Sequence, residues 1–306
     1  MVSVIITNYN YEQYVGRAIS SALRQTYKDI EVIVVDDGSR DNSESVIESF
    51  AGVDSRVRYI RQTNAGQAAA TNTGILEARG EYIAFLDADD IWYSDKLALQ
   101  MEMFKNENTS IVYSGGYEID DGDAIHGERT VSRSFNGQKF LWNMLFHNII
   151  PFSSAVIRRS CFARGGLLNP QYRVCTDYDL WLRMGKFYSF DCIEKPLIGY
   201  RVRPDSLSGN SDDMFLTARQ ITDIFVLQNP RLFPGSIIRK EKQISLFKRF
   251  YAYRRRGDLS KSLRYLVKLV WCFPFQVSTL KALAVFVLGP REAANVRFVW
   301  KYQWYE

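Results

Sequence analysis

The chain has 306 residues, of which 46% are hydrophobic and 24% charged, and its formal net charge is +5. A disordered chain would have fewer apolar residues and a larger net charge, so this composition indicates a folded protein with a sizeable core. The four cysteines include no CxxC pair, which argues against a zinc site and a disulfide framework.

Short apolar runs alternate with helical patterns through the first half of the chain. Strands are predicted at VSVIIT, EVIVV, VRYI, EYIAFLD and SIVYS, and helices near residues 11–25, 43–50, 67–77 and 94–106. β-Branched runs separated by helices of this length are typical of βαβ crossovers, which build a mostly parallel sheet flanked by helices. The predicted fold class is therefore α/β.

The pattern changes in the second half. Between about residues 117 and 150 it weakens into a polar stretch, which we interpret as loop and short strands. The block PFSSAVIRRSCFARGGL, followed by TDYDLWLRMGKF, predicts a strand, a turn at Gly165 and Gly166, and a helix. Beyond Pro204 only helices are predicted, near residues 213–228, 236–256, 259–271 and 276–288. We therefore expect one domain over residues 1–212 and an all-helical extension over residues 213–306.

Acidic side chains follow the predicted strands. Three strand ends read Thr7-Asn8-Tyr9-Asn10, Asp36-Asp37-Gly38-Ser39 and Asp87-Ala88-Asp89-Asp90. Ligands of open parallel sheets bind where the carboxyl ends of the strands meet, and five carboxylates gathered there would repel one another. Mg²⁺ or Mn²⁺ prefers such oxygen ligands and would neutralise a leaving diphosphate. Helix capping explains one or two of these acids but not the whole set.

The acids after the second strand have two equally good explanations. Asp36 and Asp37 fit a turn followed by a helix cap. They also fit a nucleoside pocket beside Thr7 and Tyr9, because a carboxylate accepts hydrogen bonds from the uracil imide or from ribose hydroxyls.

Four segments in order, VSVIITNYN, VVDDGSRDNS, NAGQAAATNTGI and ARGEYIAFLDADD, resemble the nucleotide-binding half of the family 2 inverting glycosyltransferases, which have the GT-A fold. The likeness continues into the second block and covers roughly residues 1–210. It implies an enzyme that moves a single sugar from a nucleotide diphosphate donor, expected to be a UDP-sugar, to an acceptor hydroxyl with inversion. It also implies Mn²⁺ or Mg²⁺ as cofactor.

The resemblance implies a role for each matching position. Nucleotide binding falls to Thr7, Tyr9, Asp37, Asn64, Gly66, Asp87 and Arg203, and metal binding to Asp89. Asp177 matches the general base, which takes the proton from the acceptor hydroxyl. Acceptor contacts are expected from Gly165, Gly166 and Trp181, although the amphipathic helix makes a core position the better explanation of Trp181. Asp179 is expected to pair with Arg183, four residues further on.

The sequence departs from the family pattern at several positions. Thr7 replaces a usual proline, Thr71 a frequent arginine, and Thr176 the glutamate that usually precedes the base. Arg203 stands where a histidine is often found. Because a guanidinium pairs well with phosphate and does not bind metals, we expect a diphosphate contact there. These departures affect the expected identity of the sugar-nucleotide donor more than the expected type of reaction.

The C-terminal part is strongly basic. Residues 231–306 hold 16 Lys and Arg against four Asp and Glu, whereas residues 1–230 hold 23 against 30. Lys268, Pro274, Gln276 and Lys281 interrupt its apolar run, so we expect no bilayer span. The helices could pack on the catalytic domain with solvated cations, or contact an anionic membrane surface, which we favour. A lipid-linked or cell-surface glycan intermediate as acceptor would fit the second interpretation.

The N-terminus has no basic leader and no cleavage site, so we expect a cytoplasmic protein, peripheral on the inner face of the cell membrane. Nucleic acid is not expected as a partner, because the strand-end acids would repel its phosphates.

Other functions fit less well. A dinucleotide oxidoreductase needs a GxGxxG turn where this chain has TNYNYEQYVG. A sugar-nucleotide nucleotidyltransferase, the runner-up, needs a Gly-rich basic loop that VIITNYN does not offer. A non-catalytic nucleotide-binding module would have lost the base, whereas both Asp89 and Asp177 are present. A processive synthase would add membrane spans and a QxxRW segment, so single-sugar transfer is predicted.

Overall fold

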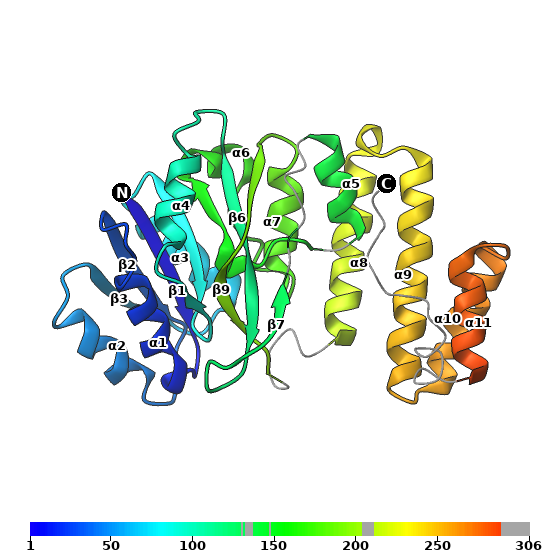
Figure 1. The fold of residues 1–306 in the computed structure, drawn as a ribbon, viewed down its shortest axis with the longest axis horizontal. Coiled ribbons are helices and arrows are strands. Elements are labelled where there is room, and N and C mark those ends of the chain that lie inside the picture. Colours follow the sequence, from blue (N-terminus) through cyan, green and yellow to red (C-terminus); the bar gives the residue numbers. More distant parts are fainter. Residues whose placement is uncertain (130, 132–136, 147, 204–210, 289–306) are drawn as a thin grey trace. The chain divides into compact units, whose positions relative to one another are not determined.

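The computed structural model describes residues 1–129, 131, 137–146, 148–203 and 211–288 (Figure 1). The chain forms two compact units, Met1–Gln228 and Asn229–Glu306. The first unit is longer than the predicted domain, which ended at residue 212, because helix α8 (Ser211–Gln228) belongs to it. The Tyr178 hydroxyl lies 3.2 Å from Oγ1 of Thr222 on α8, and Sγ of Cys175 lies 3.6 Å from Sδ of Met214. These contacts tie α8 to the first unit.

The described part of the first unit contains a nine-stranded sheet in the order β3-β2-β1-β4-β8-β6-β9-β5, with β7 paired to β6. Its strands are β1 (Val2–Asn8), β2 (Ile30–Asp36), β3 (Val57–Arg61), β4 (Tyr82–Asp87), β5 (Ile91–Trp92), β6 (Ile111–Ile119), β7 (Ile125–Arg129), β8 (Val156–Arg158) and β9 (Phe190–Arg201). The α/β class is confirmed. Strands β3, β2, β1 and β4 are all parallel, as predicted, whereas β8 is antiparallel to both β4 and β6 and makes the rest of the sheet mixed.

Helices cover both faces of the sheet in Figure 1. They are α1 (Glu12–Leu23), α2 (Ser43–Ala51), α3 (Gln67–Glu77), α4 (Lys96–Met103), α5 (Gln138–Phe146), α6 (Phe162–Gly165) and α7 (Thr176–Met184), with short 3₁₀ turns at Phe152–Ser154 and Arg159–Cys161. Val4 and Ile6 of β1 share a core with residues of α1, α2 and α4. Ile5 points to the opposite face, where a Cβ on Gly74 of α3 would lie 2.5 Å from it. Burial on both faces explains why these strands are mostly apolar.

The region after residue 117 contains more regular structure than the sequence pattern predicted. β6 extends to Ile119, and α5 buries Phe140, Leu141, Met144 and Leu145. The Phe140 ring stacks on Phe190 of β9 with ring centroids 4.0 Å apart. This packing is a long-range contact, so a pattern of neighbouring residues did not reveal it.

The second unit is helical in its described residues, as predicted. It contains α9 (Gly235–Arg255), α10 (Leu259–Cys272) and α11 (Val277–Leu288), preceded by a 3₁₀ turn at Pro230–Leu232. Its core joins all three helices through Phe247, Phe250, Leu266, Leu269, Phe273, Ala282 and Val285. Among the described helices, none is both long and apolar enough to cross a bilayer.

Candidate active site

The polar strand ends meet at one edge of the sheet, as the sequence predicts. In the β1–β2 register Asn8 lies opposite Asp36, and in the β1–β4 register Thr7 lies opposite Asp87. Asp36 is buried and has internal partners, namely Ser39, the Asn8 Nδ2 at 3.2 Å and the Tyr59 hydroxyl at 3.4 Å. Asp36 therefore stabilises the turn after β2 rather than facing a ligand.

Asp37, for which base binding is predicted, organises the loop that begins α3. Its Oδ1 accepts hydrogen bonds from Gln62 Nε2 at 2.7 Å and from the Ala65 amide at 2.9 Å, and its Oδ2 accepts one from the Gly66 amide at 2.8 Å. Gly66 has a φ of 89°, a conformation that favours glycine. The structure thus brings Asp37 together with the segment Asn64–Gly66 and gives it a positioning role that sequence reasoning missed.

The loops after β1 and β2 are joined beside this segment. The Asn10 amide donates to Ser39 Oγ at 2.9 Å, and the Arg40 amide donates to Asn10 Oδ1 at 2.8 Å. Thr7 is half-buried at the end of β1, and the Tyr9 side chain is exposed. Tyr9 is therefore accessible to a stacking ligand, as its predicted role requires.

Carboxylates from two distant parts of the chain act on Asp87 at this edge. Burial, followed by the negative charges of Asp89 and Asp177, raises the pKa of Asp87 to about 7. The Asp87 Oδ1 accepts a hydrogen bond from Gln67 Nε2 at 2.9 Å, and its amide donates to Ser153 Oγ at 3.0 Å. The end of β4 and the start of α7 thus face the same site.

The donor chemistry of this site fits a divalent cation. Asp87 and Asp89 offer carboxylate oxygens whose mutual repulsion a cation would relieve. Among the described residues no three His, Cys, Asp or Glu side chains form a complete protein cage. One or two carboxylates suit Mg²⁺ or Mn²⁺, which take their other ligands from water and phosphate oxygens.

The neighbouring Asp90 has a structural role. It is buried, its Oδ2 accepts a hydrogen bond from Ser153 Oγ at 2.5 Å, and its Oδ1 accepts one from the Arg201 amide at 2.8 Å. Burial, followed by the charges of Asp89 and Asp87, raises the pKa of Asp90 well above its usual value. Asp90 thereby fastens the segment after β4 to the end of β9.

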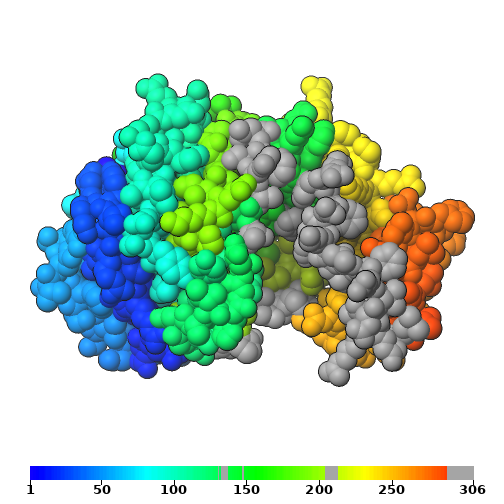
Figure 2. Space-filling model, in the orientation of Figure 1, coloured from blue at the N-terminus to red at the C-terminus, as the bar shows by residue number. Residues whose placement is uncertain are grey.

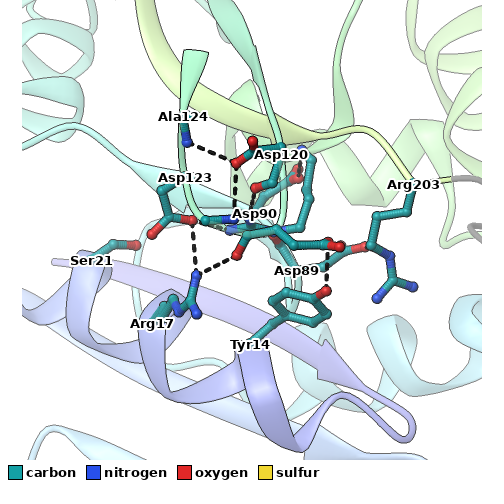
Figure 3. Close-up of polar contacts among 12 residues, drawn as sticks. Tyr14, Arg17, Ser21, Asp89, Asp90, Asp120, Asp123, Ala124 and Arg203 are labelled. Carbon is teal, nitrogen blue, oxygen red and sulfur yellow. Dashed lines mark hydrogen bonds and ion pairs between the residues drawn. The ribbon is translucent and has the colours of Figure 1, made fainter. Parts of the chain in front are cut away.

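Arg201 is a site residue that sequence reasoning missed. Its side chain is fully buried, its Nε donates to the Asp89 carbonyl at 2.6 Å, and its terminal nitrogens contact the Asp120 carbonyl and the Asp123 carboxylate. Figure 3 shows Asp89 and Asp90 close to Asp120 and Asp123 of the β6–β7 turn. The buried guanidinium of Arg201 therefore joins Asp89, the predicted metal ligand, to the β6–β7 hairpin.

Arg203, for which a diphosphate contact is predicted, lies beside Asp89. Its Nε is 4.0 Å from Asp89 Oδ2, and the guanidinium lies over the Tyr11 and Tyr14 rings, 4.8 and 5.0 Å from their centroids (Figure 3). The two rings hold the Arg203 guanidinium beside the Asp89 carboxylate. A phosphate bound to a metal ion at Asp89 would therefore lie within reach of Arg203.

Asp177 is half-buried in the first turn of α7. Its Oδ2 accepts a hydrogen bond from Asn148 Nδ2 at 2.6 Å. Burial raises the pKa of Asp177 above the ordinary value for aspartate, which makes the carboxylate a stronger base. Asp179 pairs with Arg183 at 2.9 Å, as predicted, so Asp177 is the acid of this helix that faces Asp87.

The expected acceptor contact of Trp181 is wrong. Its side chain is fully buried, with ring centroids 6.2 to 6.5 Å from those of Phe190, Phe152 and Phe85. A ring that reaches no solvent cannot stack on a sugar. Trp181 therefore belongs to the core beneath the site.

Packing and turn geometry account for Gly165 and Gly166. A Cβ on Gly165 would lie 2.7 Å from Met184 Cγ, and Gly166 adopts a φ of 70°. Arg183 closes this turn by donating to the carbonyls of Gly165 and Leu167. Because these contacts already require small residues, the structure gives no support to the predicted acceptor role of the two glycines.

Comparisons with known proteins identify the family of this chain. Residues 3–166 match the model of the family described as glycosyl transferase family 2. The UDP-Glc:alpha-D-GlcNAc-diphosphoundecaprenol beta-1,3-glucosyltransferase WfgD of Escherichia coli is 36% identical over 217 residues, which cover 69% of this chain and 80% of that protein. The glycosyltransferase RP339 of Rickettsia prowazekii is 32% identical over 207 residues, which cover 66% of this chain and 64% of that protein. The chain thus spans slightly less than two thirds of the latter.

Two solved structures share the fold. Residues 1–349 of S. aureus TarS in complex with UDP give a TM-score of 0.62 at 16% identity, over 96% of this chain and 82% of that one. The mannosyltransferase PcManGT of Pyrobaculum calidifontis, in complex with GDP-Man and Mn²⁺, gives 0.60 at 17% identity, over 96% and 77%. With a GT-A fold and a family match over more than half of its length, this chain belongs to glycosyl transferase family 2.

Proposed function

We propose that this glycosyltransferase is an inverting, metal-dependent enzyme that moves a single hexose from a nucleotide diphosphate donor to a hydroxyl of a lipid-linked or cell-surface glycan intermediate. The observation that carries the proposal is that burial, and then the charges of Asp89 and of Asp177 on α7, raise the pKa of Asp87 at the end of β4. A base and a cation-binding carboxylate must face one cleft if they serve the two ends of a single displacement.

The residues divide the reaction between them. Asp177 takes the proton from the acceptor hydroxyl while the acceptor oxygen attacks the anomeric carbon from the face opposite the diphosphate. The bond between the anomeric carbon and the diphosphate oxygen breaks in the same step, so the configuration inverts. Asp89, with Asp87, would hold Mn²⁺ or Mg²⁺, which supplies charge neutralisation of the leaving diphosphate. Arg203 adds a fixed positive charge beside it.

The names of the relatives support a UDP-sugar as donor and a lipid diphosphate as carrier of the acceptor. WfgD, by its name, uses UDP-Glc and a diphosphoundecaprenol-linked GlcNAc, and TarS is known in complex with UDP-GlcNAc. PcManGT was solved with GDP-Man and Mn²⁺, so the fold also accepts another base. A nucleotidyltransferase is disfavoured by the family match.

A matched pair of variants tests the role of Asp177. Asp177→Asn should abolish transfer from a panel of sugar nucleotides while leaving the Kd for UDP near that of the unmodified protein. Asp179→Asn is the control, because an asparagine oxygen still accepts a hydrogen bond from Arg183. Turnover retained by Asp177→Asn would remove this residue as the base.

Thermal unfolding tests the cation separately. UDP should raise the Tm of the chain when Mn²⁺ or Mg²⁺ is present and lose this effect when a chelator is added. Asp89→Asn should abolish the metal-dependent part of the shift. An equal UDP shift with and without metal would contradict the assignment of Asp89.

A further inference from the structure

Helix α10 exposes a stripe of apolar side chains. Leu266 and Leu269 are buried in the core of the second unit, whereas Leu259, Leu263, Val267, Val270 and Trp271 are exposed. These five positions are separated by one, three or four residues and therefore lie along one side of the helix. The Trp271 side chain is 87% exposed, although an indole ring is among the most apolar surfaces that a protein can offer to water.

The apolar surface continues past the end of α10. Phe275, in the turn between α10 and α11, is 93% exposed, and Val277 and Leu280 at the start of α11 are also exposed. The opposite side of α11 contributes Ala282 and Val285 to the core. Together, the exposed side chains form an apolar surface over α10 and the α10–α11 turn. Figure 2 draws these two elements in orange. Extended apolar surfaces of this kind mark interaction sites.

Cations border this apolar surface. Arg264 and Lys268 are exposed and each lies one residue beyond a member of the stripe, so they lie along its margin. Arg239 and Lys242 of α9 line a groove with Trp271 and Phe273. No acidic residue occurs from Leu259 to Leu288. The surface therefore combines exposed aromatic rings with positive charge alone.

We propose that α10 and the α10–α11 turn dock on an anionic phospholipid surface, with Trp271 and Phe275 in the region between the headgroups and the acyl chains. Arg264 and Lys268 face the lipid phosphates, and the groove at Arg239 and Lys242 receives one of them. A helix with an apolar stripe, aromatic anchors and a basic margin lies in the plane of a membrane interface. A second copy of the chain is a poorer occupant, because a symmetric contact would oppose the same cations.

The proposal predicts how tightly the full chain binds vesicles. It should bind vesicles that contain phosphatidylglycerol and bind vesicles of phosphatidylcholine alone much more weakly. Trp271→Ser with Phe275→Ser should lower the partition coefficient on the order of a hundredfold, since each aromatic ring loses about tenfold. Arg264→Gln with Lys268→Gln should lower it roughly twentyfold and reduce its dependence on salt, since each cation contributes about fivefold.

Val53→Ser is the matched control, because Val53 is an exposed apolar residue of the first unit. Its binding to vesicles should equal that of the unmodified chain. Wild-type binding by both double variants, or no vesicle binding by the unmodified chain, would overturn the proposal. A change of molar mass in light scattering with the aromatic variant, without vesicle binding, would assign the surface to a second copy instead. The UDP-induced Tm shift, measured on the same variants, reports folding and keeps a failure of docking distinct from a failure of the proposed catalysis.

Discussion

The hydrogen bond from Asn148 to Asp177 offers a sharp test of the proposed base. Burial raises the pKa of Asp177, and the donor at 2.6 Å opposes this rise because it stabilises the charged carboxylate. Asn148→Ala removes the donor, so the pKa of Asp177 should rise further. Transfer requires the ionised base, and activity is therefore present above this pKa and lost as the pH falls through it. The acid limb of the pH profile should move to higher pH in the variant.

The size of the displacement follows from the environment of the donor. A hydrogen bond to a charged group contributes about 1.5–3 kcal/mol when it is buried. Asn148 is exposed, and water can replace part of the lost bond, so roughly half of this contribution should be lost. That corresponds to a displacement of about 0.5–1 pH unit.

The assay is kcat/KM as a function of pH, with donor and divalent cation held constant. Asn148→Asp should displace the acid limb further, because a second carboxylate beside Asp177 disfavours its ionisation. Asn169→Ala, in the loop before α7, is the control and should leave the profile unchanged. An acid limb that stays in place in both Asn148 variants would refute the reasoning, because another group would then govern the protonation.

Three further predictions concern the framework of the site. Arg201→Met should lower the free energy of unfolding by about 2–4 kcal/mol, because the carbonyls of Asp89 and Asp120 lose their buried donor. Arg17→Ala removes an exposed partner of Asp123 and should cost about 1 kcal/mol or less, so equal losses in urea unfolding would contradict this contrast. Trp181→Phe should leave the KM for the acceptor unchanged, because the indole N–H has no hydrogen-bond partner among the described residues and the ring serves packing alone; a raised KM would restore an acceptor role. Asp37→Asn should raise the Kd for UDP about tenfold in calorimetry by releasing the amides of the loop before α3, and an unchanged Kd would show that this loop needs no such anchor.

The residues at the ends of β1, β2 and β4 could largely be predicted, because their positions depend on local sequence patterns. The runs that become β1, β2 and β4 are short, apolar and followed directly by polar residues. Since parallel strands end at one edge, Asp87 and Asp89 could be placed beside Thr7 without knowledge of the tertiary structure. The i,i+4 pair of Asp179 and Arg183 was predictable for the same reason, because helical spacing alone brings the two side chains together.

The remaining features depend on contacts between distant segments. Arg201 and Arg203 lie two residues apart in GYRVR. Nothing in that sequence shows that Arg201 is buried or that the Arg203 side chain lies beside the Asp89 carboxylate. The role of Asp37 depends on backbone amides nearly thirty positions away, which carry no side-chain signal. Trp181 had two explanations, and only the surrounding rings of β4 and β9 decide between them.

Strand β8 has a consequence for how such an enzyme can diversify. It is three residues long, yet among the described strands it alone joins β3, β2, β1 and β4 to β6 and β9. Asp177, the proposed base, lies on α7, beyond this three-residue strand. In the proposed reaction the two substrates would therefore be bound by halves that share few backbone hydrogen bonds. We expect changes of acceptor preference to accumulate on one side of β8 while sugar-nucleotide recognition on the other side stays intact.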